Sequence, residues 1–550
     1  MATLNFKGKP FVQNYHLSVK YHQLIPRKNK SLTKKVSLRD NLIIHGDNLK
    51  ALKALLPTYA GKIKCIYIDP PYNTGNEKWA YNDNVNSPMM QDWLGKVVDK
   101  EDLTRHDKWL CMMMPRLKLL RELLAPDGII AVTIDDNEVF NLGLLMDAIF
   151  GEDKKLACAP WLAEPSGGKE KTGLRGGHEY VVIYHNGDSS SITQEERSTG
   201  ELNLQDEIGP YRKGRELRKW GGTSLRSDRP GQWYSLRTPD GIEVFPIRND
   251  GKEGHWRWGR QNPKILAILE NPNLLHWEKR PYDSGVTYKG QKERWVPYVK
   301  IRDKKRSVGW STWLDSYGSN ADGTRELKEI FGKKVFDTPK PTSLIQWIIS
   351  LHCDEDALVL DSFPGSGTTA HAVLAINAED GGNRRFILAE CEDHADKITA
   401  ERVRRVIKGV PKAKDENLRK GLRGTFSYFE LGPPIEMESI LSGDNFPSYM
   451  ELARYVFYTA TGEEFDPDAV DEKKNFIGQS AQYLAYLFYK PDMDYLKATA
   501  LTLDRAKALG PYKKKRRLVF APTKYLDQEH LDELRIDFAQ LPFEIYQLVK

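Results

Sequence analysis

The 550-residue sequence predicts an α/β fold, and two stretches carry most of that prediction. The apolar run 62–68 ends in the motif Asp69-Pro70-Pro71-Tyr72, and the apolar run 358–360 enters the glycine-rich turn 361–367. Short apolar runs that lead into turns and then into helical patterns are typical of strand–helix units. The length also predicts several domains and more than enough residues for a large core.

The first run is predicted to be a buried strand that stops at Asp69. Five apolar or β-favouring residues at 63–67 suit a strand covered on both faces. Pro70 disfavours helical backbone at Asp69, and neither proline can donate to a strand ladder. The Asp69 carboxylate, the Pro70 carbonyl and the Tyr72 ring could then hold the exocyclic amino group of a flat base. A proline turn that merely ends a core strand is the alternative.

The second run predicts half of a nucleotide-binding strand–turn–helix unit. Gly365 and Gly367 would let backbone amides approach a ligand closely, and a helix that opens at Thr368 favours an anionic group at its amino terminus. A further strand at 386–389 delivers Glu390, 23 residues after Gly367, near where such units hold a ribose hydroxyl. No G-x-x-x-x-G-K-[ST] motif occurs, which argues against a nucleoside triphosphatase.

Together the two motifs resemble those of the DNA amino-methyltransferases, whose signatures are a D-P-P-Y loop and an F-x-G-x-G loop that binds S-adenosylmethionine. D-P-P-Y comes first here, as in the β group of that family. The layout is most similar to the Mod subunits of Type III restriction-modification systems and to related solitary adenine methyltransferases, over roughly 1–190 and 335–430. The resemblance implies a Rossmann-like, S-adenosylmethionine-dependent sheet with a circularly permuted motif order, an inserted target-recognition domain and a small C-terminal α/β domain.

The resemblance and the composition together predict four segments. We expect the catalytic half of the methyltransferase domain at 1–195 and a DNA-binding insertion at 196–334. The cofactor half follows at 335–434, and a C-terminal accessory domain occupies 435–550, where short apolar runs alternate with helical stretches.

The resemblance also implies the site residues. Asp69 and Pro70 would accept the two amino protons of an adenine, and Tyr72 would stack on the extruded base. Asp47 could instead cap the helix that follows it. We expect no metal. The expected catalytic residues are Asp69, Pro70, Pro71 and Tyr72, and the expected cofactor-binding residues are Asp47, Lys340, Pro341, Asp361, Phe363, Gly365, Ser366, Gly367, Thr368 and Glu390.

Charge and tryptophan are concentrated in the predicted insertion. Residues 211–310 hold 23 Lys or Arg against 11 Asp or Glu, a net charge of +12 in a chain whose total is +6. Such a module suits a surface that lies along phosphates and stacks on bases. A tryptophan-rich core with a solvated basic face is the alternative. Seven of the 13 tryptophans fall in this range: Trp220, Trp233, Trp256, Trp258, Trp277, Trp295 and Trp310.

The cysteines and the hydropathy of the sequence limit where in the cell the protein is expected. The five cysteines form no C-x-x-C pair, so the sequence suggests neither a zinc site nor a disulfide framework. No apolar stretch reaches the length of a membrane span, and the amino terminus lacks the apolar core of a signal peptide. We expect a cytoplasmic protein that acts on double-stranded DNA. The resemblance implies a homodimer, with a restriction (nuclease-helicase) subunit as a candidate partner.

The predicted reaction is methyl transfer to the N6 amino group of a flipped adenine. Cytosine-N4 methylation uses the same chemistry, but its enzymes usually carry serine where this chain has Asp69. A non-catalytic recognition subunit would not need both motifs intact. A small-molecule or protein methyltransferase would not need so large a basic, tryptophan-rich insertion.

Overall fold

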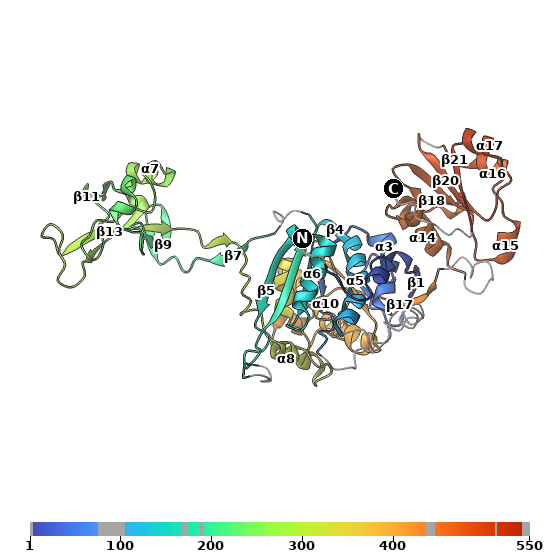
Figure 1. Cartoon of the computed structure of the whole chain (residues 1–550), viewed down its shortest axis with the longest axis horizontal. Coiled ribbons are helices and arrows are strands. Elements are labelled where there is room, and N and C mark those ends of the chain that lie inside the picture. Colours follow the sequence, from blue (N-terminus) through green and yellow to red (C-terminus); the bar gives the residue numbers. More distant parts are fainter. Residues whose placement is uncertain are drawn as a thin grey trace. The chain divides into compact units, whose positions relative to one another are not determined.

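The computed structural model describes residues 4–74, 105–167, 173–187, 192–435, 446–511 and 514–541. Within the chain, unit 1 comprises Met1–Thr193 and Ser311–Lys550, and unit 2 comprises Gln194–Trp310. Unit 2 carries the strands β9 and β13 and the helix α7, whereas the large sheet and the C-terminal strands belong to unit 1 (Figure 1).

A nine-stranded sheet forms the centre of unit 1, in the order β1-β17-β2-β16-β15-β3-β4-β6-β5. The strands from β17 to β4 are parallel, and β1, β6 and β5 pair antiparallel at the two margins. This is the α/β sheet expected of a Rossmann-like methyltransferase. The strands are β1 (His22–Pro26), β2 (Leu42–His45), β3 (Ile63–Ile68), β4 (Leu124–Ile134), β5 (Lys155–Trp161), β6 (Glu179–His185), β15 (Leu358–Asp361), β16 (Arg385–Glu390) and β17 (Ser427–Pro434).

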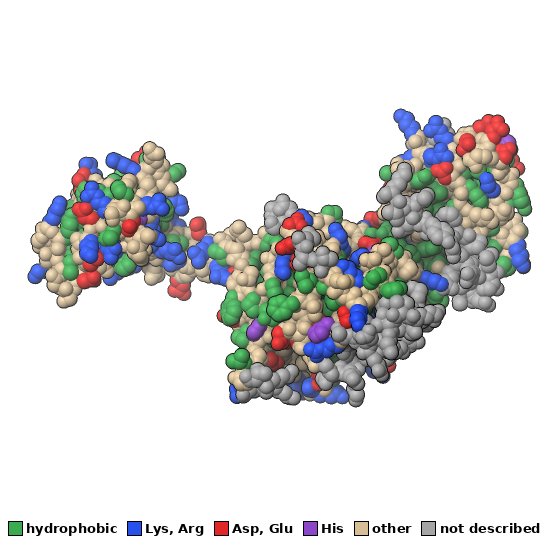
Figure 2. Space-filling model, in the orientation of Figure 1, with side chains coloured by type: hydrophobic (Ala, Val, Ile, Leu, Met, Phe, Trp, Pro, Cys, Tyr) green, Lys and Arg blue, Asp and Glu red, His purple; other side chains and the backbone are tan. Residues whose placement is uncertain are grey.

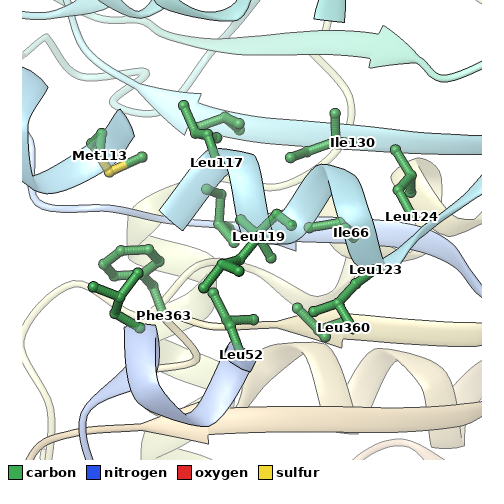
Figure 3. Packing of buried hydrophobic residues seen from close by; sticks show 14 of the residues in the cluster. Leu52, Ile66, Met113, Leu117, Leu119, Leu123, Leu124, Ile130, Leu360 and Phe363 are labelled. Atoms are coloured by element: carbon green, nitrogen blue, oxygen red, sulfur yellow. The ribbon is translucent and has the colours of Figure 1, made fainter. Parts of the chain in front are cut away.

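Helices cover both faces of this sheet, as the unbroken apolar runs of its strands predict. In β3, Ile66 joins the core formed with α3 and α5, while its neighbour Cys65 is equally buried on the other face. Figure 3 shows Leu119 of α5 next to Ile66, with Leu52 of α3 in the same cluster. Each such side chain contributes about 1.5–3 kcal/mol when fully buried. The helices around the sheet include α3 (Asn48–Tyr59), α5 (Arg105–Leu123), α6 (Val139–Phe150), α9 (Thr342–Ser350), α10 (Thr368–Asp380) and α11 (Glu401–Lys408).

The pairing of β3 with β15 brings the two sequence motifs together. These parallel strands lie side by side, with Val359 opposite Cys65 and Leu360 opposite Ile66. Their carboxyl ends therefore meet at one edge of the sheet, although they are almost 300 residues apart in the chain. Open α/β sheets bind ligands at this edge, where the strand order changes direction.

Unit 2 is an antiparallel β structure with its own core. Trp256 is buried there, and Trp258, Trp277 and Trp295 pack against the same core. These tryptophans therefore build the core of the unit, as the alternative interpretation of the sequence predicts. Lys and Arg side chains occupy much of the visible surface of the unit (Figure 2). Its elements are β7 (Glu195–Ser198), β8 (Leu204–Asp206), β9 (Gly209–Glu216), β10 (Leu236–Arg237), β11 (Glu243–Val244), α7 (Pro263–Glu270), β12 (Leu275–Pro281), β13 (Glu293–Ile301) and β14 (Lys305–Val308).

The C-terminal part of unit 1 contains a second, four-stranded sheet in the order β18-β19-β20-β21, with the last three strands parallel. In the described ranges of the chain, no helix is both long and apolar enough to span a bilayer. The C-terminal elements are α14 (Tyr449–Thr461), β18 (Phe476–Gln479), β19 (Tyr483–Leu487), α15 (Met493–Ala498), α16 (Leu503–Ala508), β20 (Arg516–Ala521), α17 (Gln528–Glu533) and β21 (Ile536–Gln540).

Candidate active site

A cavity of about 720 Å³ opens at the carboxyl edge of the sheet, where β3 and β15 end. Both sequence motifs line it, together with the chain just before α9 and the end of β16. Asp47, Pro341 and Gly367 are not among the described residues that line it. The predicted site residues that do are Asp69, Pro70, Pro71, Tyr72, Lys340, Asp361, Phe363, Gly365, Ser366, Thr368 and Glu390.

Both carboxylate oxygens of Asp69 are engaged. Oδ1 accepts a hydrogen bond from the Thr133 hydroxyl at 2.6 Å and lies 2.9 Å from the Tyr72 hydroxyl, whose single proton is shared with Glu179 Oε2 at 2.8 Å. Oδ2 lies 3.0 Å from the Lys340 ammonium. These contacts fix the orientation of the carboxylate at the end of β3, so a substrate amino group would meet a preorganised acceptor.

Lys340 is a buried cation between two acids. Its ammonium lies 3.5 Å from Glu179 Oε2 as well as next to Asp69, and 4.8 Å from the centroid of the Tyr72 ring. Burial by itself would lower the pKa of Lys340, but the carboxylates of Asp69 and Glu179 outweigh burial and raise the pKa above its usual value. Lys340 is therefore charged at neutral pH.

The D-P-P-Y loop is held at its far end by buried side chains. The indole of Trp109, on α5, donates to the Pro71 carbonyl at 2.7 Å. Asn73 has a positive φ of 56° and donates its side-chain amide to the carboxylate of Glu138, which is fully buried. A non-glycine residue in the left-handed region persists only when its surroundings fix it, and functional loops often contain one.

Asp361 ends β15 and braces the glycine loop. Its Oδ1 accepts from the Phe363 amide at 2.9 Å, and its Oδ2 accepts from the Thr369 hydroxyl at 2.5 Å. Burial raises the pKa of Asp361 to about 8, and the neighbouring negative charges of Asp69 and Glu390 act in the same direction. Asp361 therefore holds a proton at neutral pH while the cavity is free of a cation. A bound cation would favour loss of that proton and would be stabilised by the resulting carboxylate.

Glu390 connects the end of β16 to the glycine loop. Its Oε2 accepts from the Gly365 amide at 3.0 Å, and its Oε1 accepts from the Glu392 amide at 3.0 Å. An ionised carboxylate offers about four lone-pair sites, so further acceptor capacity is left for a ligand hydroxyl. This geometry suits the ribose-binding role that the sequence predicts for Glu390.

The glycines of the loop allow its tight conformation. Gly365 and Gly367 have φ values of 49° and 81°. A Cβ at Gly367 would come within 3.0 Å of the Thr399 carbonyl oxygen, and one at Gly365 within 3.0 Å of the Phe336 ring. The Gly367 amide donates to Pro364 within the turn. A tight turn packed against protein therefore requires glycine at 367, and the close approach of a ligand to the backbone there stays a prediction.

A buried arginine supports the loop from below. Arg402, on α11, is inaccessible to solvent and donates to the Ser366 hydroxyl at 3.0 Å and to the Thr368 hydroxyl at 2.7 Å. Burial lowers the pKa of Arg402 to about 10, against the opposing effect of Glu326. The guanidinium therefore stays charged at neutral pH and orients two hydroxyls of the loop.

Besides Gly367, two of the predicted cofactor residues lie outside the lining of the cavity. Asp47 is the N-cap of α3, and its Oδ1 accepts from the Lys50 amide at 3.1 Å, as the capping alternative predicts. Pro341 is buried at the N-cap position of α9. For Asp47 and Pro341, contact with a cofactor stays a prediction.

The lining of the cavity also includes residues that the sequence did not predict for the site, among them Glu179, Phe336 and His394. Glu179 opens β6, four strands along the sheet from β16, so only the sheet order brings it to Lys340. Phe336 packs edge-on against His394, with 5.4 Å between ring centroids. The position of His394, four residues after the acid that ends β16, is the one signal that could have suggested it.

The geometry fits the binding of a nucleoside cofactor with a cationic end. The cavity joins a buried acid at the glycine loop, a second acid at the end of the next strand and a third acid beside an aromatic ring. The fold and this site define a methyltransferase, with S-adenosylmethionine as its methyl donor.

The chain belongs to the DNA methylase family, whose model matches residues 63–401. It is similar to the Type III restriction-modification enzyme EcoPI Mod subunit of Escherichia phage P1, with 30% identity over 74% of this chain and 68% of that protein. It is also similar to the Type II methyltransferase M.KpnI of Klebsiella pneumoniae, with 35% identity over 63% and 79%. The StyLTI Mod subunit of Salmonella typhimurium is 31% identical over 73% of this chain and 62% of that protein.

Proposed function

We propose that this DNA methyltransferase transfers the methyl group to the exocyclic N6 amino group of an adenine flipped out of double-stranded DNA. The observation that carries the proposal is the position of Asp69 and Tyr72, on one strand end, beside Asp361 and Glu390 at the same cavity. Cytosine-N4 methylation is the second candidate, and the carboxylate of Asp69 argues against it.

Each half of the cavity has its own task. Asp69 Oδ2 and the Pro70 carbonyl accept the two amino protons of the adenine, which opposes the positive charge that develops on nitrogen during attack. Tyr72 stacks on the extruded base and holds it in line. Asp361 binds the amino group of the cofactor, Glu390 binds its ribose, and Ser366 and Thr368 line the site of its methionine end. When bound, S-adenosylmethionine supplies an electrophilic methyl group.

Lys340 must give up part of its contact with Asp69 before the adenine can use Oδ2. Glu179 offers the alternative acceptor, because its Oε2 already lies 3.5 Å from the same ammonium. A shift of Lys340 toward Glu179 would free the Asp69 oxygen without leaving a buried cation unpaired, a state that is costly in a protein interior.

The remaining segments take part in recognition and assembly. The insertion predicted at 196–334 contains all of unit 2 except its first two residues and recognises the DNA sequence, and the halves at 1–195 and 335–434 carry the chemistry. The chain acts as a homodimer and serves as the modification subunit of a Type III-like system, in which 435–550 contacts the second protomer or a restriction subunit. Light scattering of the purified protein, with and without a co-expressed restriction subunit, tests this assembly.

One assay tests the proposed reaction directly. The protein is incubated with plasmid DNA and S-adenosylmethionine labelled in the methyl group, and the DNA is digested to nucleosides and separated. We expect the label in N6-methyldeoxyadenosine. Label in N4-methyldeoxycytidine would establish the second candidate, and no labelled nucleoside with an otherwise folded protein would refute both.

A further inference from the structure

Trp220 is an exposed tryptophan of unit 2 that is nevertheless held in place. It is 49% exposed, and its indole nitrogen donates to Glu216 Oε2 at 2.8 Å. The Arg218 guanidinium lies 4.6 Å from the ring centroid. Glu216 and Arg218 are themselves buried and form an ion pair at 2.8 Å. The side chain thus has a hydrogen-bonded edge and a cation against the ring, while about half of its surface is open to solvent.

The backbone around Trp220 is tied to one short segment, 253–256. The amides of Lys219 and Arg226 each donate to a carbonyl of that segment at 3.0 Å. The segment in turn donates an amide to the carbonyl of Gln232 at 3.1 Å. Residues 219–232 therefore form a braced loop, and this loop presents Trp220 from a defined backbone.

The same segment holds a second pair of arginine and tryptophan. The Arg226 guanidinium lies 4.7 Å from the centroid of the Trp233 ring. That ring stacks on Phe245, with 5.2 Å between centroids and 29° between planes. Phe245 is 38% exposed. Two arginine-backed aromatic groups are thus anchored to the single segment 253–256.

This arrangement differs from that of four other tryptophans of unit 2. Trp256, Trp258, Trp277 and Trp295 pack into the core, whereas Trp220 is exposed. An exposed aromatic side chain held in one position has lost its conformational freedom before a ligand arrives, which lowers the entropic cost of binding. Base stacking on aromatic rings and cation contacts to phosphate are the two interactions that such a basic surface offers DNA.

We propose that Trp220 is a DNA-contacting residue that packs its open surface on a base at an unstacked step of the duplex. Arg226 and Arg229 are both exposed, and their guanidiniums contact phosphates beside it; that of Arg226 also pairs with Glu253 at 2.8 Å. The proposal rests on the proposed function, because it assumes that unit 2 is the DNA-binding unit. Beyond the proposed function, it names the residue that contacts DNA and the way in which it does so.

The test uses the full-length protein and a labelled duplex fragment that the parent protein methylates. Trp220→Ala should weaken binding roughly 5- to 150-fold, the range for removal of one aromatic side chain that stacks on a base. The dependence of affinity on salt should not change, since every phosphate contact remains. Trp220→Phe should keep most of the affinity, because the ring remains. Leu266→Ala, an exposed aliphatic residue on α7 of the same unit, is the matched control and should bind like the parent.

A spectroscopic measurement covers the case in which Trp220→Ala disturbs the loop. DNA should quench part of the tryptophan emission of the parent, and this part should be absent in Trp220→Phe. Equal quenching in both proteins, or parent-like affinity of Trp220→Ala, would overturn the inference.

A charge variant separates this inference from the proposed function. Arg226→Gln combined with Arg229→Gln should weaken binding to all sequences and reduce the log–log salt slope by about 0.9 for each phosphate that the variant no longer binds. If this variant loses affinity while Trp220→Ala does not, unit 2 binds DNA and only the role of Trp220 is wrong. If neither variant changes DNA affinity, the assignment of DNA binding to unit 2 fails as well.

Discussion

The ammonium of Lys340 lies 3.0 Å from Oδ2 of Asp69, across the gap between two segments that are 271 residues apart in the chain. The contact orients the proposed catalytic carboxylate while no substrate is present. It also occupies one of the two oxygens that an adenine amino group would need. The proposed catalytic acid is therefore preorganised but partly blocked by Lys340. Substitution of the residues that contact Lys340 can test this arrangement.

Asp69→Ala should abolish methyl transfer and leave cofactor binding nearly intact, because the carboxylate acts on the amino group. The expected loss is at least about 2.7–4 kcal/mol of transition-state stabilisation, the scale for one preorganised electrostatic partner. Single-turnover methylation measures the rate, and calorimetry measures cofactor affinity. A variant that kept more than half of the parent rate would remove Asp69 from the mechanism.

Glu179→Gln should lower the rate of transfer by about 10- to 150-fold, the scale of about 1.5–3 kcal/mol for a hydrogen bond to a charged group. The substitution removes the negative charge toward which the Lys340 ammonium can shift, because the glutamine amide offers only a neutral oxygen. Glu164→Gln is the matched control, because Glu164 shares the Asn320 amide with Glu179. If both variants are slower than the parent by the same factor, the contact with Asn320, and not that with Lys340, determines the rate.

Cofactor binding should release a proton near neutral pH. The pKa of Asp361 is about 8 in the free protein, and a bound ammonium group would favour the carboxylate. Affinity should therefore fall up to tenfold per unit as the pH drops below about 8, and should change little from this cause above it. Calorimetry in buffers of different ionisation heat measures the proton, which Asp361→Asn should abolish. A binding heat that did not depend on the buffer would contradict the role of Asp361.

The raised pKa of Asp361 also makes the stability of the cofactor-free protein depend on pH. The native state keeps a proton on Asp361 that the unfolded chain loses above its ordinary pKa of 3.8. The free energy of unfolding should therefore decline as pH rises from about 4 to about 8. Asp361→Asn should flatten that part of the stability profile, and urea unfolding at a series of pH values measures it.

Gly367→Ala should weaken both stability and cofactor binding, and Gly381→Ala should weaken stability alone. The two glycines flank α10 with φ values of 81° and 79°, so each alanine costs about 1–2 kcal/mol of backbone strain. Only at Gly367 does the added Cβ meet protein, at 3.0 Å from the Thr399 carbonyl; nothing lies within 4 Å at Gly381. Thermal unfolding and calorimetry measure both effects. Unchanged cofactor affinity in folded Gly367→Ala would separate the loop from the cofactor site.

The sequence by itself determined the class of this protein, because the motifs that define the class consist of consecutive residues. Two prolines after an apolar run end β3 at Ile68, next to Asp69. The glycine turn and the acid 23 residues after Gly367 predict a strand–helix–strand unit, and β15, α10 and β16 form it. Family membership confirmed the methyltransferase prediction, which followed from motifs that each span a few residues.

Only the tertiary structure decided which distant residues meet. The sheet order places Glu179 of β6 near Lys340, and no spacing in the chain encodes that contact. Burial likewise depends on everything packed around a residue, so the raised pKa of Asp361 and the fixed Arg402 could not be predicted. Composition alone placed seven tryptophans in one basic segment, but only packing distinguished those that build the core of unit 2 from the exposed Trp220.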